Sequence, residues 1–221
     1  MQIIGPIVFG MLLVFLFTRR LNRAGREHGK KMAEFIQAEH ESNFTRRKEL
    51  PDELFFVPDA SELPPPPPNG DGRLVWIYKR ITDLCGERMI KADESLSNIE
   101  LKKMYGAANL DVIIGYEENY ATFIRYLNEY AEKLIKAESF AEARKTMDIC
   151  ISAGSDVSRS FILAADASAA LGDGEALAGL EEKLKKTDIP ANIKDRTSVY
   201  IMEKAESITQ ANIKQDKSDL N

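Results

Sequence analysis

Five consecutive residues, Tyr116-Glu117-Glu118-Asn119-Tyr120, come closest in type to a reaction centre. Paired carboxylates can divide the roles of general acid and general base. Adjacent residues of a helix, however, point about 100° apart. We therefore expect one carboxylate in solvent and the other paired with a Lys or Arg. The two tyrosines suit contact with a partner better than catalysis, so this stretch is a candidate partner-binding patch and no catalytic residue is predicted.

The histidines and cysteines show no spacing typical of a metal or redox site. His28 and His40 are the only histidines, and no Cys or carboxylate pattern surrounds them. Cys85 and Cys150 lie in apolar helical patterns without a CxxC motif, which indicates reduced thiols in a core. Gly70-Asp71-Gly72 is a turn, and no glycine-rich phosphate loop occurs. The sequence therefore predicts no metal, no cofactor and no enzymatic activity.

An apolar run, IIGPIVFGMLLVFLF at Ile3–Phe17, is the element that would position everything after it. Met1 to Thr18 gives 18 residues, and a membrane-spanning helix needs about 17 to 25. A cleaved secretory signal would need a basic segment before the run and a small-residue cleavage site after it, and neither is present. The basic residues instead follow the run: Arg19, Arg20, Arg23, Arg26, Lys30 and Lys31. Because flanking bases stay in the cytoplasm, we predict a single transmembrane helix at 1–18, with the N-terminus outside and the remainder cytoplasmic at the cell membrane.

Charge is distributed unevenly along the chain. Residues 1–48 contain nine basic and four acidic residues, a net charge of +5, whereas residues 49–221 contain 21 basic and 31 acidic residues, a net charge of −10. The basic part favours anionic lipid close to the predicted span, and the acidic part argues against nucleic acid as a partner. Residues 19–42 are predicted as a basic juxtamembrane helix with a thin apolar stripe: Leu21, His28, Met32, Phe35 and Ile36.

Residues 43–72 have the composition of a proline-rich linker. The run Pro64–Pro68 is interpreted as a stiff polyproline II spacer, with binding to an aromatic groove as the alternative. Leu54–Val57 is too apolar for a solvent-exposed linker that makes no contacts. We expect it to dock on the following domain as a short extended segment, or else to bind a partner.

From Arg73 onward the pattern predicts helices alone, hence an all-α domain over 73–211 with a polar tail at 212–221. The first helix is expected to reach about Ile90. Ser97 and Glu100 form a capping box that begins a helix ending before Gly106. Further helices are expected from about Asn109 or Asp111 to Ile135, from Phe140 to Gly154, from Asp156 to Gly172, over Glu175–Lys186 and after Pro190.

The residues at 124–157 resemble the tetratricopeptide pattern, in which small residues let two helices approach closely. Leu127, Ala131, Phe140, Ala143 and Cys150 occupy its characteristic positions. A shift of 34 residues brings Phe161 and Ala165 to equivalent places, but Gly174 and Leu177 then depart from the pattern. The resemblance implies antiparallel helical hairpins, one fair and one degenerate, over less than a third of the chain. The flanking helices would cap them, since about three repeats are needed for a continuous core.

The overall layout is similar to a group of small, uncharacterised bacterial single-pass membrane proteins. Two segments carry that similarity: NFTRRK at 43–48 and SNIELKKMYGAANLDVIIGYEENY at 97–120. The resemblance implies no activity.

Two classes of function fit these features. The first is a membrane-tethered scaffold or adaptor whose helical repeats bind a protein or peptide. The second is an enzyme or regulator of lipid or cell-envelope chemistry, which would need a polar-lined pocket near Glu117 or Glu118. A self-associating structural subunit, hence a homo-oligomer, is a third alternative. An open groove of exposed apolar and aromatic residues in the structure would favour the scaffold over the enzyme.

Overall fold

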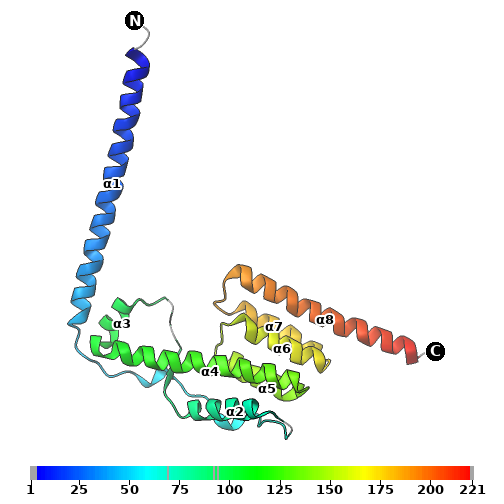
Figure 1. Cartoon of the computed structure of the whole chain (residues 1–221). Coiled ribbons are helices and arrows are strands. Elements are labelled where there is room, and N and C mark those ends of the chain that lie inside the picture. Colours follow the sequence, from blue (N-terminus) through cyan, green and yellow to red (C-terminus); the bar gives the residue numbers. More distant parts are fainter. Residues whose placement is uncertain (1–3, 69, 92, 94, 220–221) are drawn as a thin grey trace. The chain divides into compact units, whose positions relative to one another are not determined.

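The computed structural model describes residues 4–68, 70–91, 93 and 95–219, and most of them are helical (Figure 1). Within these residues there are eight α-helices and two strands of two residues each. The predicted all-α class is therefore confirmed. The chain divides into two compact units. Unit 1 contains the first helix, the segment after it up to Leu50, and Asp93–Ile113, and unit 2 contains Pro51–Ala92 and everything from Ile114 onward. The predicted single domain over 73–211 is thus shared between the two.

Helix α1 of unit 1, Ile4–Asn43, is uninterrupted. Among the residues whose structure is described, no helix is long and apolar enough to cross a membrane. The transmembrane helix predicted at 1–18 is therefore not supported by the structure. Most of the residues in that predicted span, 1–16 and Thr18, have side chains that lie outside the described part.

Helix α3, Asn98–Tyr105, begins as predicted. The Ser97 hydroxyl accepts from the Glu100 backbone N–H, and the Glu100 carboxylate accepts from the Ser97 N–H, so the capping box is confirmed. The helix ends at Gly106, which has a positive φ of 96°. A 3-10 turn, η3 (Ala107–Asn109), then leads into the next helix. The first residues of that helix, Leu110–Ile113, still belong to unit 1.

Asn109 fastens the segment after α1 to this turn. Its side chain is buried, accepts from Arg47 Nε at 2.9 Å, and donates to the carbonyl oxygens of Lys48 (2.6 Å) and Tyr105 (2.8 Å). Backbone hydrogen bonds from Lys48 N to Tyr105 O and from Ala107 N to Thr45 O lie on either side. The segment 43–48 and the first part of the segment 97–120 therefore meet in unit 1.

Unit 2 begins with a docked segment rather than a free linker. It contains the turns η1 (Asp52–Leu54) and η2 (Ala60–Glu62), and between them strand β1, Phe55–Phe56. Strand β1 pairs antiparallel with β2, Met89–Ile90. Of the two alternatives for Leu54–Val57, docking on the chain itself is confirmed.

Helix α2, Gly72–Cys85, is shorter than predicted. Leu74, Ile77, Ile81 and Leu84 face the core at helical spacing. Gly86 ends the helix, and Met89 and Ile90 are extended. The prediction that this helix reaches Ile90 was wrong because Met89 is buried in either conformation, so its apolar character could not distinguish strand from helix.

The proline run is not a freestanding spacer. Leu63 and Pro64 are buried, and the Pro64 carbonyl oxygen accepts a hydrogen bond from the Tyr130 hydroxyl at 3.0 Å. Asp71 then caps α2 by accepting from the Leu74 N–H. The start of the run is therefore anchored on α4 before α2 begins.

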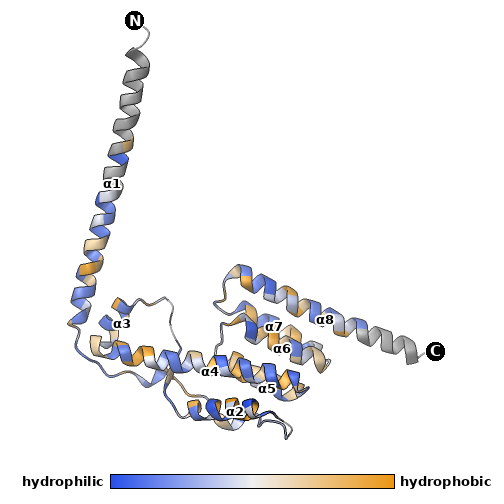
Figure 2. Cartoon of the chain, viewed as in Figure 1, coloured by the Kyte–Doolittle hydropathy of each residue, from blue (hydrophilic) through white to orange (hydrophobic). Residues whose placement is uncertain are grey.

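The remaining helices follow the predicted order, with ends shifted by a few residues. Gly115 lies inside the first of them, and the last continues through much of the predicted polar tail. They are α4 (Leu110–Lys136), α5 (Phe140–Ser152), α6 (Ser158–Ala170), α7 (Gly174–Lys185) and α8 (Ala191–Asp219). In Figure 2, apolar and polar residues alternate along the helices of unit 2, as expected of amphipathic helices.

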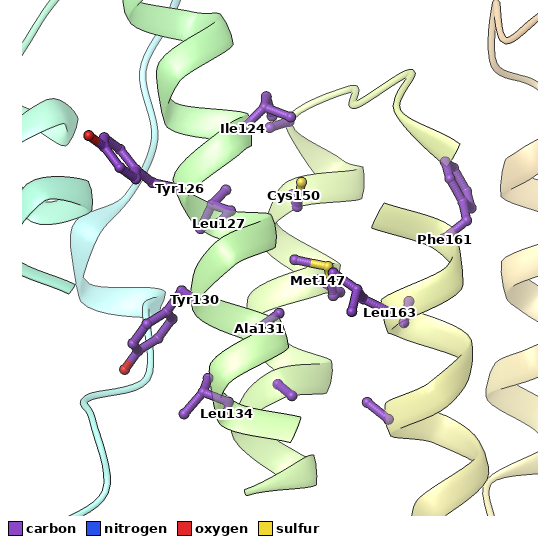
Figure 3. Packing of buried hydrophobic residues seen from close by; sticks show 14 of the residues in the cluster. Ile124, Tyr126, Leu127, Tyr130, Ala131, Leu134, Met147, Cys150, Phe161 and Leu163 are labelled. Carbon is purple, nitrogen blue, oxygen red and sulfur yellow. The ribbon is translucent and has the colours of Figure 1, made fainter. Parts of the chain in front are cut away.

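The core of unit 2 lies between these helices. Short connections of three to five residues join α4 to α5, α5 to α6 and α6 to α7, and such connections make successive helices antiparallel neighbours. Figure 3 shows side chains of α4, α5 and α6 meeting in this core. The residues assigned to repeat packing lie here: Leu127, Ala131, Ala143, Phe161 and Ala165 are fully buried, and Phe140 is half-buried.

Candidate functional site

The tyrosines of the predicted patch at 116–120 contact the chain's own β1 strand. Tyr116 meets Phe55 edge to face with ring centroids 5.5 Å apart, and Tyr120 meets Phe56 in the same way at 5.9 Å. The buried Tyr120 hydroxyl donates to the Ala153 carbonyl oxygen at 2.9 Å, and burial raises the pKa of this phenol. Both rings therefore hold an internal segment in place.

The polar residues of that patch do not form a reaction centre. Asn119 Nδ2 donates to the Arg88 carbonyl oxygen at 3.1 Å, beside strand β2. Glu118 is exposed, whereas Glu117 is half-buried and its burial raises the pKa of the carboxyl group above the ordinary 4.5. These contacts give the patch a role in positioning β1 and β2 on α4.

The predicted metal and thiol residues are spread through the chain. In the described part, no group of three or more His, Cys, Asp and Glu side chains could hold a metal ion. His28 and His40 are exposed, and the His40 ring lies tilted against the Phe44 ring with 4.9 Å between their centroids. Cys85 and Cys150 are free, and burial raises the pKa of both thiols, which disfavours the reactive thiolate.

The basic residues predicted to flank a membrane are exposed on α1 wherever their side chains are described. These residues are Arg19, Arg20, Arg26, Lys30 and Lys31. The side chain of Arg23 lies outside the described part.

One cavity of unit 2 is an open groove of about 490 Å³ between α4 and the start of α6. Its α4 wall follows one helix face, because residues 121, 125, 128 and 132 are separated by four, three and four positions. Its opposite wall carries Val157 and Arg159. Eight residues line it: Ala121, Ile124, Arg125, Asn128, Glu129, Glu132, Val157 and Arg159.

Asn128 gives the groove wall a polar group without a full set of partners. The residue is only 5% exposed, and its Nδ2 donates to the Ile124 carbonyl oxygen at 2.8 Å and to Cys150 Sγ at 3.7 Å. Its Oδ1 is buried, and no hydrogen-bond donor within the described residues reaches it. Leaving such an acceptor unpaired costs about 1 to 3 kcal/mol, so its position beside a groove indicates a place where a donor can be supplied.

The two carboxylates that line the groove are held in ion pairs. Glu132 accepts from Lys136 at 2.8 Å and from Arg159, and these two cations hold the pKa of the carboxyl group below the ordinary 4.5. Glu129 accepts from two nitrogens of Arg73. Arg125 lies over the Tyr126 ring, with 4.7 Å between its Cζ atom and the ring centroid. The rim is therefore polar and charged, while Ile124 and Val157 supply apolar surface. This combination is typical of a protein-binding surface.

The second cavity is smaller, about 290 Å³, and mixed in charge. Lys91, Lys183 and Lys186 line it together with Asp156 and Asp188. It also lies at the C-terminal ends of α5 and α7, whose carbonyl groups disfavour anions. It therefore does not have the character of an anion site.

Sequence reasoning did not identify the groove. One signal was available, because Asn128 is a polar residue among apolar neighbours on a strongly periodic helix. The wall formed by Val157 and Arg159 has no comparable signal, since their closeness to α4 depends on the packing of α4, α5 and α6.

Comparisons with protein-family models, with curated proteins and with solved structures find no match for this chain.

Proposed function

We propose that this protein is a membrane-tethered scaffold whose helical unit holds an extended segment of a protein partner in the groove between α4 and α6. The observation that carries the proposal is the groove itself, which is open, has a volume of about 490 Å³ and combines apolar side chains with a polar rim and one unpaired buried acceptor. An extended peptide offers backbone N–H groups that could pair with such an acceptor. Both carboxylates that line the groove, Glu129 and Glu132, are engaged in ion pairs, which favours binding over catalysis.

We further propose that α4–α5 and α6–α7 are two tetratricopeptide-like hairpins and that α8 caps them. The buried alanines at 131, 143 and 165 support this, since small residues at these positions let helices approach closely. Such stacking produces the extended surfaces that repeat proteins use for binding.

A bulky residue placed in the groove tests the binding site. Ala121 is exposed on the groove wall, so Ala121→Arg should fill the groove while leaving the core intact. Full-length chain would be purified from detergent-solubilised membranes, and co-purifying proteins would be quantified by mass spectrometry. We expect at least one partner to fall about tenfold, equivalent to about 1.4 kcal/mol.

The matched control is Ala178→Arg, which introduces the same side chain at an exposed position on α7. The partner should be retained by this variant. Equal retention by both variants, or equal loss from both, would contradict the groove as the binding site.

The tether is proposed from the uncharged run at Ile3–Phe17 and the bases that follow it, with the helical unit on the cytoplasmic side. Full-length chain should remain with membranes after an alkaline wash, and chain lacking residues 1–18 should be released. Protease added to intact cells should leave the C-terminus uncut. Full co-sedimentation of the shortened chain would contradict the tether.

A further inference from the structure

The middle of α1 carries an apolar stripe that the chain leaves uncovered. Residues 25–37 are all exposed. Within them Met32, Phe35 and Ile36 are 49, 54 and 58% exposed, whereas the large apolar residues of α4 and α6 in unit 2 are mostly buried. Three contiguous side chains of this size form a surface that a partner would stabilise.

The stripe follows the spacing of a helix-pairing seam. Gly25, His28, Met32 and Phe35 are separated by three, four and three residues, the repeat that keeps one helix face against another. With about 100° per residue, all four lie within about 60° of Met32, and Ile36 flanks them. Gly25 is small and the neutral form of His28 carries no charge, so neither residue prevents a second helix from approaching closely.

Within residues 25–37, charged residues are confined to the other faces of the helix. By the same geometry, every charged residue in this stretch lies at least about 100° from Met32. These residues are Arg26, Glu27, Lys30, Lys31 and Glu34. In a parallel pair of identical helices each seam residue faces its own copy, so a charge on the seam would repel itself. The seam carries none from Gly25 to Ile36.

The proposed membrane tether determines which partner can cover the stripe, so this step rests on the proposed function. Because α1 is uninterrupted, Ile36 lies 18 residues beyond Thr18, or about 27 Å along the helix axis at about 1.5 Å per residue. Lipid cannot cover the stripe at that distance. Copies inserted in one direction, however, present the same stripe at the same height and in parallel.

We propose that α1 pairs with α1 of a second copy of this chain, in parallel, along Gly25, His28, Met32 and Phe35, with Ile36 at the edge of the seam. The scaffold is then a dimer held together outside the membrane. Each dimer presents two grooves, so it binds a partner carrying two matching segments with higher avidity than a single groove would.

Cysteine crosslinking tests the seam in the full-length chain, reconstituted in lipid vesicles. Cys85 is replaced by Ser, and Cys150 is retained because it is fully buried. Met32→Cys and Phe35→Cys place a thiol on the seam, and Lys30→Cys and Gln37→Cys place one on the opposite face of the same turns. We expect the seam thiols to form disulfide-linked dimers about fivefold more than the control thiols.

Equal crosslinking at all four positions, or crosslinking to a protein of another mass, would overturn the proposal. A second arm uses Phe35→Glu with Gln37→Glu as the matched control, and measures energy transfer between labelled copies. The Phe35 side chain is over half exposed, so replacing it should not prevent folding. Phe35→Glu should abolish the energy transfer, whereas Gln37→Glu should retain it. Transfer retained by both variants would also overturn the seam.

The same samples separate this proposal from the tether. Sedimentation of vesicles reports the tether, and the crosslinking pattern reports the seam. Chain that sediments but shows no preference for positions 32 and 35 contradicts the seam alone. Chain that stays in solution yet crosslinks at those positions contradicts the tether alone and supports the pairing.

Discussion

Gly106 shows how one residue fixes the path of two distant segments in unit 1. Its φ of 96° lies in a region that L side chains rarely adopt. A β-carbon added there would overlap the Arg46 carbonyl oxygen and lie 2.6 Å from Arg47 Cα. Because both obstacles are backbone atoms, no side-chain movement can relieve them.

Gly106→Ala should therefore lower the free energy of unfolding by about 2 to 3 kcal/mol. The measurement is denaturant unfolding followed by circular dichroism. Gly115→Ala is the control, because nothing lies within 4 Å of its added β-carbon and the change should add up to about 1 kcal/mol of helix stability. Similar effects of the two substitutions would contradict this account of Gly106.

The carboxyl group of Glu132 makes the rim of the groove sensitive to acid. Its pKa is lowered from the ordinary 4.5 by Lys136 and Arg159, so its ion pairs contribute stability that is fully present above that ordinary value. The contribution is lost as pH falls through the lowered folded-state pKa. The stability difference between the native chain and Glu132→Gln should stay constant above about pH 5 and shrink toward about pH 3.

Chemical denaturation at a series of pH values measures this difference. High salt provides the control, because it screens partly exposed pairs and should reduce the pH-dependent part. A difference that remains constant down to about pH 3 would show that the pairs contribute nothing at this position.

At the residue level, the sequence predicted what depends on near neighbours. The capping box of Ser97 and Glu100 could be predicted because both partners lie within four positions. The stop at Gly106 could be predicted because glycine commonly ends helices. Its contact with Arg46, 60 residues earlier, depends on tertiary packing and had no local signal. The same packing leaves the Asn128 oxygen unpaired, although the polar residue itself could be noticed in the sequence.

At the scale of elements, strand β1 is small but well anchored. Phe56 is half-buried between Tyr120 and Phe123, with ring centroids 5.9 Å from each. Its neighbour Val57 points away from the core and is 81% exposed. Phe56 and the residue that follows the strand thus differ sharply in what they contribute.

Phe56→Ala should lower the free energy of unfolding by about 2 kcal/mol, less than the 3 to 5 kcal/mol typical of a fully buried Phe. Val57→Ala should change it by less than about 0.5 kcal/mol. Thermal unfolding of both variants gives the comparison. A loss at Val57 as large as that at Phe56 would mean that β1 is not docked as described.

The elements themselves were largely predictable because their apolar residues repeat every three or four positions. α4 and the helices after it were expected near their observed bounds for this reason. The end of α2 was mispredicted, since periodicity alone cannot tell a buried strand residue from a buried helix residue. The docking of the proline run was also missed, because composition reports stiffness and not location.

At the scale of the molecule, the two compact units should respond separately to local damage. Asn109 lies entirely within unit 1, where its three hydrogen bonds join residues 47 and 48 to residue 105. Asn109→Ala leaves the carbonyl groups of Lys48 and Tyr105 without this donor and should cost about 1 to 3 kcal/mol.

Hydrogen exchange can localise that loss. The amides of Lys48 and Ala107, which are bonded across the same junction, should exchange faster in Asn109→Ala. Amides in the cores of α4 beyond residue 124 and of α6 should be unchanged. Faster exchange throughout both units would show that they unfold as one.

The order of synthesis gives the docked strand a further consequence. Phe56 leaves the ribosome 64 residues before Tyr120, the ring it packs against. At about 5 to 20 residues per second, Phe55 and Phe56 remain uncovered for roughly 3 to 13 s. A nascent chain of this protein therefore exposes these two rings without their α4 partners during that interval, and chaperones that bind extended apolar segments should find them there.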